Sequence, residues 1–252
     1  MNDVLSVEVD SIEFDGTGDV LESTQFALTR VSGLFDGVEM RRPQTDRPQA
    51  HGQFWAPGYL SGRVIVLEGE LYTSSPREQD KEVSRLVGLL ADGGKRTMTV
   101  QRGTRAVHTQ VARLATPTVT IDHYGLLARF QITFWAPDPL WYGDQQSFGP
   151  ATSLDLYHWG TFPALPRFTV AGSAAAAGGY TIAQGSRSYV VSAGPTAGQT
   201  DVIDFATGWL YRNGALQSSK VSRYETWTVG PGIPETATCT VPFSAAVYDT
   251  YA

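Results

Sequence analysis

The sequence predicts a mainly β protein, in which an α+β first domain with one helix is followed by a second domain that is a β-sandwich. Many short segments alternate apolar and polar residues, which is typical of strands. Only one stretch, at about residues 76–92, shows the helical spacing of apolar residues. Charged residues also become sparser after Gln146, so the predicted domains are residues 1–146 and 147–252.

The first domain begins with a predicted strand at residues 5–9, where every second residue is apolar. Ile12 and Phe14 continue the alternation with the opposite parity, so a turn or bulge is expected near Asp10. The turn at residues 122–125 predicts a hairpin between the strands that flank it. Further strands are expected at residues 26–31, 64–71, 98–100, 107–111 and 119–121.

Residues 40–62 are polar, rich in proline and glycine, and without periodicity, which predicts a long loop. Loops of this length inside a domain are commonly functional. The large aromatic side chains of Phe54, Trp55 and Tyr59 are unfavourable in water. They are therefore candidate contacts, either within the same subunit or with the next subunit or a partner.

The predicted helix has a clear start signal. Ser75 is placed as the N-cap, Pro76 suits the first helical position, and Glu78 completes an S-x-x-E capping box. Gly93 and Gly94 can adopt the left-handed conformation that ends a helix. The helix is expected to lie on a sheet through one apolar stripe, formed by Val83, Leu86, Val87 and Leu90.

Residues 126–142 predict a strand that runs into a rigid aromatic corner. The apolar residues at positions 128, 130, 132 and 134 form its core face, and Trp135 points to the opposite face. Pro137 and Pro139 cannot donate to a ladder, so strand pairing should stop just before them. Trp135 and Trp141 then either fill a buried corner or contact a partner.

The second domain consists of short predicted strands with no helical period, which indicates a β-sandwich. Asn213 and Gly214 form a strong hairpin signal, because both tolerate positive φ. Residues 143–153 are predicted to be a linker or loop, and residues 173–179 a flexible connection. The strands are expected at residues 168–170, 180–182, 189–191, 202–205, 209–211, 224–229 and 237–243.

Composition limits the classes of function. A net charge of −6 argues against a nucleic-acid-binding groove, because phosphate binding requires clustered Lys and Arg. Cys239 is the single cysteine, and its alternating context predicts a buried, inert thiol in a chain that folds in a reducing compartment. The N-terminal residues do not resemble a secretion signal, and no apolar run reaches about 18 residues. We therefore expect a soluble chain without membrane insertion.

The sequence contains no recognisable catalytic or metal-binding motif. Asp15 and Asp19 could hold Ca²⁺, but their spacing matches no EF-hand loop. Asp201 and Asp204 could act as a glycosidase pair, although solvated turn positions explain them better. We predict no catalytic residue, cofactor or metal site, and no enzyme. The histidines also lack the spacing of metal ligands: His51, His108, His123 and His158.

Several motifs occur in a recognisable order along nearly the whole chain. They are RVIVLEGEL at residues 63–71 ahead of the helix, FWAPDPLWYG at 134–143, the segment 160–172 that leads into the second domain, GWLYRNG at 208–214 and WTVGPG at 227–232. This order resembles the distal tail protein family of long-tailed, non-contractile bacteriophages. One departure is Pro234, which stands where an Asn is expected. The most telling residues are Phe134, Ala136, Asp138, Pro139 and Tyr142.

The resemblance implies a structural protein at the distal end of the phage tail in the virion, folded and assembled in the host cytoplasm. It implies a homo-oligomeric ring, usually a hexamer, built by the first domains, with galectin-like second domains projecting outward. The ring would join the tail tube protein to a tail-hub or tail-associated lysin protein and surround the DNA channel without binding DNA specifically. Tape-measure and receptor-binding proteins are further candidate partners. A closed ring needs two different surfaces on each subunit, and the candidates are Phe54, Trp55, Tyr59, Trp135 and Trp141.

An alternative function is a carbohydrate-binding adhesin or receptor-binding tail component. In that case Trp209 or Trp227 of the second domain would stack on glycans, although aromatic residues more often fill cores. The galectin motif H-x-N-x-R with a following W-x-x-E-x-R is absent from the sequence. Sugar binding is therefore not implied by the resemblance itself.

Overall fold

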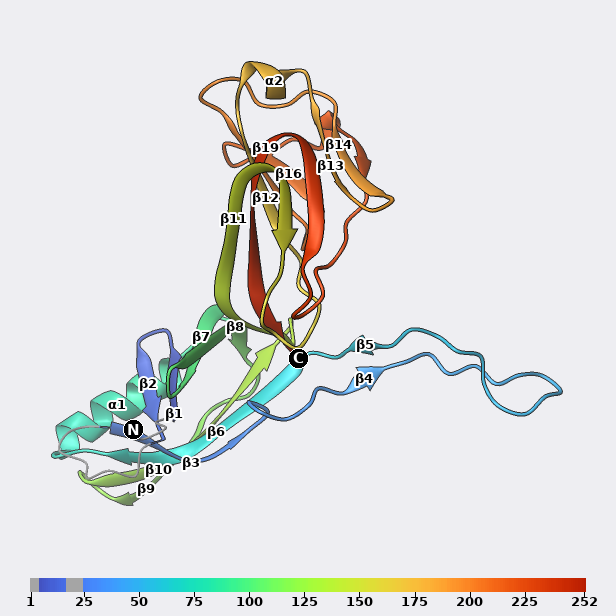
Figure 1. Cartoon of the computed structure of the whole chain (residues 1–252). Coiled ribbons are helices and arrows are strands. Elements are labelled where there is room, and N and C mark those ends of the chain that lie inside the picture. The colour runs from blue at the N-terminus through green and yellow to red at the C-terminus, as the bar shows by residue number, and fades with distance from the viewer. Residues whose placement is uncertain (1–4, 17–24) are drawn as a thin grey trace. The chain divides into compact units, whose positions relative to one another are not determined.

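The computed structural model describes residues 5–16 and 25–252, and the chain divides into two compact units (Figure 1). The first unit is Met1–Trp141 with Ala252, and the second is Tyr142–Tyr251. Strands dominate both units, so the predicted mainly β class is confirmed. Among the described residues, the one helix longer than a single turn is α1 (Pro76–Gly88).

The first unit is a β-barrel with additional strands. Its pairings run β7–β1–β2–β3–β6–β10–β8 and return to β7, so the sheet closes on itself. All of these pairs are antiparallel except β2–β3. Closure removes the exposed edges of an open sheet. The strands are β1 (Leu5–Val9), β2 (Ile12–Asp15), β3 (Gln25–Ser32), β6 (Arg63–Tyr72), β7 (Arg96–Arg102), β8 (Arg105–Arg113), β9 (Thr118–His123) and β10 (Leu127–Ala136).

The barrel interior is filled by the predicted core faces of the strands. On β10 the even-numbered residues from Ala128 to Phe134 are buried, as the alternation predicts, and the strand ends just before Pro137. The rings of Phe14, Phe26 and Phe130 lie 5.6–5.7 Å apart, measured between centroids. Gly69 makes room for this cluster, because a Cβ there would lie 2.6 Å from the Phe130 ring and 2.2 Å from the Ala27 carbonyl oxygen.

Helix α1 begins as predicted but ends earlier. The Ser75 hydroxyl accepts a hydrogen bond from the Glu78 N–H, while the Glu78 carboxylate accepts from Ser74 rather than from the N-cap. The helix ends at Gly88, short of the predicted end near residue 92. The reason is local backbone geometry, since Leu90 adopts a φ of +52°.

The buried face of α1 is more polar than the predicted apolar stripe. Gln79, Glu82 and Leu86 are buried, whereas Val87 is largely exposed, so the predicted stripe is only partly correct. The Gln79 side chain accepts from the Gly125 N–H at 2.9 Å and donates to the His123 carbonyl at 3.3 Å. These bonds tie the helix to the predicted β9–β10 hairpin, which the strand pairing confirms.

The second unit is a β-sandwich. Strand β19 pairs with β11, β12 and β13; from β12 the pairing continues to β15, β16 and β17, and from β13 to β14 and β18. The predicted Asn213–Gly214 hairpin joins β16 to β17, with positive φ at both residues. The strands are β11 (Trp141–Leu156), β12 (Arg167–Ala171), β13 (Tyr180–Gln184), β14 (Arg187–Val191), β15 (Thr200–Asp204), β16 (Trp209–Arg212), β17 (Ala215–Leu216), β18 (Val221–Tyr224) and β19 (Glu235–Tyr251).

Three sequence predictions for this unit are wrong. The predicted linker at residues 143–153 belongs to β11, because pairing with β19 stabilises an extended segment that has little strand pattern of its own. The predicted flexible connection at residues 173–179 contains helix α2 (Ala174–Ala177), whose Ala176 N–H is capped by Ser173. The strand expected at 224–229 ends at Tyr224.

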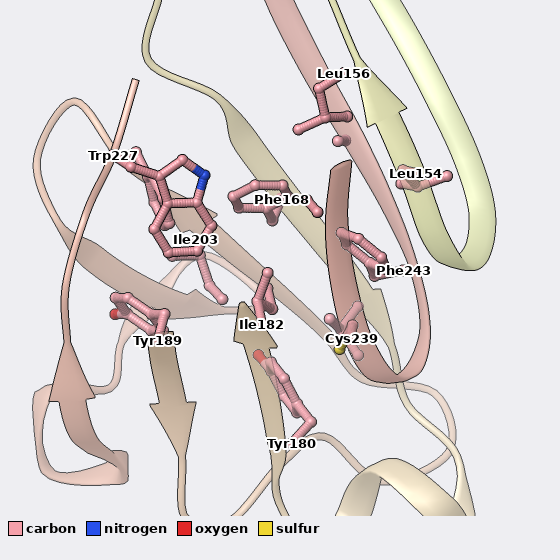
Figure 2. Close-up of a cluster of buried hydrophobic side chains, with 14 of the residues drawn as sticks. Leu154, Leu156, Phe168, Tyr180, Ile182, Tyr189, Ile203, Trp227, Cys239 and Phe243 are labelled. Carbon is pink, nitrogen blue, oxygen red and sulfur yellow. The ribbon is translucent and has the colours of Figure 1, made fainter. Parts of the chain in front are cut away.

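The core of the second unit is a single aromatic and aliphatic cluster (Figure 2). Phe205 packs edge-on against both Phe168 and Trp227, with ring centroids 4.9 and 4.7 Å apart. The Cys239 thiol is buried in this cluster, and burial raises its pKa, consistent with an inert thiol.

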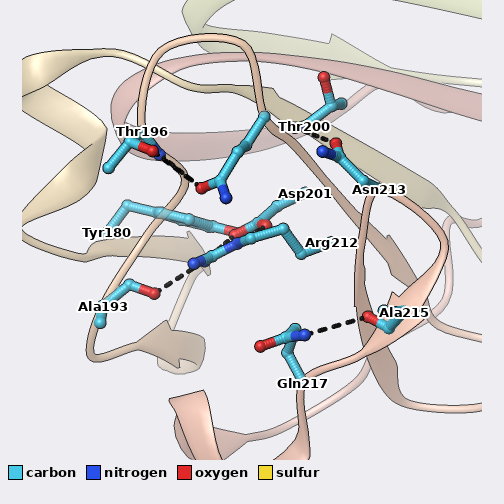
Figure 3. Close-up of polar contacts among 10 residues, drawn as sticks. Tyr180, Ala193, Thr196, Thr200, Asp201, Arg212, Asn213, Ala215 and Gln217 are labelled. Carbon is cyan, nitrogen blue, oxygen red and sulfur yellow. Dashed lines mark hydrogen bonds and ion pairs between the residues drawn. The ribbon is translucent and has the colours of Figure 1, made fainter.

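Asp201 is buried in an ion pair, which corrects its predicted place in a solvated turn (Figure 3). Arg212 donates to both carboxylate oxygens, at 2.7 and 2.9 Å, and to the Ala193 carbonyl at 2.8 Å. The Tyr180 hydroxyl also donates to the Asp201 carboxylate, at 3.0 Å. Burial and the adjacent carboxylate raise the pKa of Tyr180.

Candidate interaction surface

Residues 33–62, which join β3 to β6, form an arm. The sequence predicted most of it as a loop, but it contains a small antiparallel sheet of β4 (Met40–Arg41) and β5 (Tyr59–Leu60). Figure 1 shows the arm as a long excursion in which the chain runs out and returns beside itself. Its two halves are therefore arranged as an extended hairpin.

Few hydrogen bonds hold the two halves of the arm together beyond β4 and β5. The Phe54 N–H donates to the Thr45 carbonyl at 2.9 Å, and the Gln53 side chain donates to Asp46 at 3.0 Å. Pro43, Pro48 and Pro57 cannot donate to the ladder. Because an isolated two-stranded ribbon is marginally stable in water, the arm is suited to docking on another surface.

The three predicted contact aromatics of the arm are all exposed. Trp55 retains 80% of its accessible surface, and Phe54 and Tyr59 also remain mostly in solvent. The guanidinium of Arg47 lies 5.7 Å from the centroid of the Phe54 ring. Within the described chain no arm arginine forms a salt bridge. The arm thus presents apolar rings beside cationic groups, which is typical of interaction surfaces.

Arg63, at the start of β6, fixes the base of the arm. Its Nη1 donates to the carbonyls of Gly33 and Asp36, at 2.9 and 2.8 Å, and its Nε donates to the Pro139 carbonyl at 2.9 Å. Desolvation lowers the pKa of this buried guanidinium, and the charge of Asp36 partly opposes that effect. No role was predicted for Arg63 from the sequence, where its one signal is a single Arg at the start of a strand that is otherwise apolar on its core face.

Trp135 and Val64 form a small exposed apolar patch on the barrel. They are directly opposite each other in the β10–β6 ladder, and Trp135 keeps 42% of its surface accessible. The indole also lies against Gly62, where a Cβ would be 2.4 Å from its Nε1 atom. Trp141, by contrast, is buried beneath Arg63, so it is removed from the candidate contacts.

The two tryptophans considered for glycan stacking have different environments. Trp209 lies at the start of β16 with 47% of its surface exposed. Trp227 is buried in the core against Phe168 and Phe205, so it cannot contact a ligand and that prediction is wrong. Tyr224, the last residue of β18, is also exposed and was not among the predicted contact residues.

Metal binding and membrane insertion were also considered for the described residues. Across residues 5–16 and 25–252, no group of three or more His, Cys, Asp or Glu side chains is placed to hold a metal ion. Asp15 accepts a hydrogen bond from Gln25, while Asp19 of the considered calcium turn lies outside the described residues. No helix in the described part of the chain has the length and hydrophobicity of a membrane span.

The fold is shared with solved structures of phage tail proteins. The crystal structure of the Dit protein of phage SPP1, described as a paradigm of the hub adsorption apparatus in phages that infect Gram-positive bacteria, matches with a TM-score of 0.76 at 13% identity. The match covers 98% of this chain and 99% of that chain. The chain has the fold of a phage distal tail protein. Comparison with protein-family models and with curated protein sequences gives no match.

The distal tail fold also matches chains of the phage P2 baseplate in its activated conformation. The structure with Ca gives a TM-score of 0.57 at 11% identity and covers 100% of this chain and 99% of that chain. The structure with Sr gives 0.56 at 11% identity, with 98% of each chain covered. At identities of 11–13% these matches show a shared fold and not a shared set of residues.

Proposed function

We propose that the chain is a structural distal tail protein, a non-enzymatic hub that forms a ring at the distal end of a phage tail. The observation that carries this proposal is the match to SPP1 Dit over nearly the full length of both chains. The ring, which we take to be hexameric, is built by the first units and joins the tail tube to the adsorption apparatus.

The first unit offers the two different surfaces that a closed ring requires. One surface is the arm, with Phe54, Trp55 and Tyr59, and the other is the patch of Trp135 and Val64 on the barrel. In the proposed ring the arm of each copy lies on the barrel of the next copy. Burial of these exposed rings then supplies much of the association energy.

The proposed partners follow from the position of a hub. The tail tube protein binds one face of the ring and a tail-hub or tail-associated lysin protein binds the other, with tape-measure and receptor-binding proteins as further neighbours. DNA passes through the lumen without specific binding, since a chain with a net charge of −6 lacks the cationic clusters that retain phosphate. The protein is assembled in the host cytoplasm and resides in the virion tail.

Light scattering with size-exclusion chromatography, followed by negative-stain imaging, tests the ring. The expected mass is six times that of the 27.3 kDa chain. The triple variant Phe54→Ser/Trp55→Ser/Tyr59→Ser is expected to lose the ring while keeping the circular dichroism spectrum of the folded chain. The matched control is Trp159→Ser, which removes an exposed indole of the second unit and should leave the ring intact.

Labelling of virions tests the location independently of ring formation in solution. Antibody fragments against the chain, imaged on intact phage particles, are expected to mark the tail extremity. Particles whose tail ends lack the protein would refute the proposal. A six-fold ring that survives the triple variant would refute the role of the arm but not that of the hub.

A further inference from the structure

A cavity of about 290 Å³ is present in the second unit, between residues of β14, β16 and β18 and the turns beside them. Its volume is close to the lower limit of pockets that bind small ligands, about 300 Å³. Three aromatic residues and two hydroxyl residues dominate its walls, and none of the lining residues is charged. The main lining residues are Tyr189, Thr207, Trp209, Ser218, Val221 and Tyr224.

One wall of the cavity is a turn that hydrogen bonds hold in place. The carbonyl of Asp204 accepts from the N–H groups of Thr207 and Gly208, at 3.2 and 2.8 Å. The Thr207 hydroxyl accepts from the Trp209 N–H at 3.3 Å, and the buried Tyr189 donates its hydroxyl to the Gly208 carbonyl at 3.1 Å. Tyr189 thus ties this turn to the core, while about half of the surface of Trp209 remains accessible.

A second part of the lining depends on a β-bulge in β18. Val190 pairs with Arg223 and Val191 pairs with Val221, so Ser222 is an extra residue in the ladder. In a regular strand, residues three apart point to opposite faces. The bulge allows Val221 and Tyr224 to line the same cavity, and bulges commonly redirect side chains at functional sites.

The lining residues favour a ligand with a neutral ring that has an apolar face and a polar edge. A lining without charged side chains gives no compensation for desolvating an ionic ligand. The aromatic faces of Trp209 and Tyr224 carry negative potential and attract weakly positive C–H groups. The hydroxyls of Ser218 and Tyr224 and the indole N–H of Trp209 can form hydrogen bonds at the edge of such a ring.

We propose that this cavity binds a neutral saccharide, as a mono- or disaccharide unit of a surface polysaccharide, stacked on Trp209 and Tyr224. A sugar ring has both an apolar C–H face and a hydroxyl edge, which match the two kinds of wall. This site is independent of the proposed ring, because every residue that lines it belongs to the second unit. It gives the hub a direct, weak contact with a cell surface, and a ring of identical copies would multiply that contact.

Saturation-transfer NMR with the full chain tests the site. The probes are glucose, galactose, rhamnose, N-acetylglucosamine, N-acetylgalactosamine and their soluble disaccharides, with N-acetylneuraminic acid and the peptide acetyl-Leu-Phe-amide as contrasts. At least one neutral sugar is expected to bind, and the variants Trp209→Ala and Tyr224→Ala each weaken it about ten-fold or more. Trp159→Ala, which removes another exposed indole of the same unit, is expected to leave the affinity unchanged.

Three results would overturn the proposal. The first is the absence of binding by every neutral sugar to the folded wild-type chain. The second is sugar binding that persists in both Trp209→Ala and Tyr224→Ala. The third is binding of the peptide or the acidic sugar in preference to all neutral sugars. Circular dichroism of each variant ensures that lost binding is not caused by unfolding.

Discussion

The guanidinium of Arg63 lies over the indole of Trp141, with 5.7 Å between Cζ and the ring centroid. Since Arg63 also holds the carbonyls of Gly33 and Asp36, one buried side chain joins the base of the arm to the aromatic corner after β10. Carbonyl oxygens accept from Nε and Nη1 and an aromatic face lies beside the guanidinium, which offsets part of the cost of burying a charge at the start of a core strand. Among the described residues, Nη2 is buried without a hydrogen-bond partner.

The variant Arg63→Met is expected to destabilise the folded chain by about 1–3 kcal/mol, because it leaves the part-buried carbonyls of Gly33, Asp36 and Pro139 without this donor. The free energy of unfolding is measured by urea denaturation. The control Arg41→Met lies on the exposed arm and should change stability by less than about 0.5 kcal/mol. Equal effects of the two substitutions would show that the hydrogen bonds of Arg63 do not stabilise the base of the arm.

Gly69→Ala is expected to destabilise the barrel by about 1–3 kcal/mol, since the added Cβ would overlap the Phe130 ring and the Ala27 carbonyl. Gly88→Ala is the matched control, because apart from its chain neighbours and the backbone of its own helix no atom lies within 4 Å of the corresponding Cβ position. Thermal unfolding of the two variants should therefore differ clearly in midpoint. A wild-type midpoint for Gly69→Ala would mean that the barrel wall can shift at no cost.

Asp201→Ala is expected to destabilise the second unit by about 3–5 kcal/mol, because it leaves the Arg212 cation without its anionic partner in a largely buried site. The double variant Asp201→Ala/Arg212→Met should recover part of that loss. The exposed pair Arg223 and Glu225 serves as the control, and its removal should cost less than about 1 kcal/mol. The free energy of unfolding of each variant is measured by urea denaturation. A loss below about 1 kcal/mol for Asp201→Ala would show that the buried ion pair does not stabilise the second unit.

The stability of the second unit is expected to fall as the pH rises above about 10. Burial raises the pKa of Tyr189 from 10.0 to about 12, and it also raises the pKa of Tyr180. The unfolded chain therefore releases these protons at lower pH than the folded chain, which favours unfolding between pH 10 and 12.

Urea denaturation at pH 8, 10 and 11, with Tyr180→Phe and Tyr189→Phe, measures this effect. Each substitution should make the free energy of unfolding less dependent on pH above about 10. The exposed Tyr224→Phe is the control for the loss of a tyrosine hydroxyl at the surface. Unchanged slopes in both core variants would show that other groups cause the alkaline loss of stability.

Local sequence patterns predicted the elements whose conformation depends on nearby residues. The alternation along β10 identified its core face, and Ser75 and Pro76 identified the start of α1. Asn213 and Gly214 identified a hairpin, because two positive φ angles are a property of the turn itself. The exposed aromatics of the arm were also predicted as candidate contacts, since burial of large rings is a general requirement.

Other features depended on partners distant in sequence. Residues 143–153 lack a strand pattern and become extended through pairing with β19. Asp201 looked like a turn residue, and only the approach of Arg212 and Tyr180 makes its burial possible. The different exposure of the two tryptophans likewise became visible only in the tertiary structure. The indole of Trp227 is covered by Phe168 and Phe205, whereas that of Trp209 is partly exposed.

A mainly β chain with one helix, a long loop whose aromatic side chains need a packing partner, and the lack of a catalytic motif could all be predicted from the sequence. These properties follow from hydrophobic period, turn residues and composition, which act over a few neighbouring residues. Three features are visible only in the folded structure: the first unit closes into a barrel, Arg63 holds the base of the arm, and the bulged strand β18 lines a cavity together with Trp209. Each of these depends on contacts between distant segments, whose energies arise only when the strands have paired.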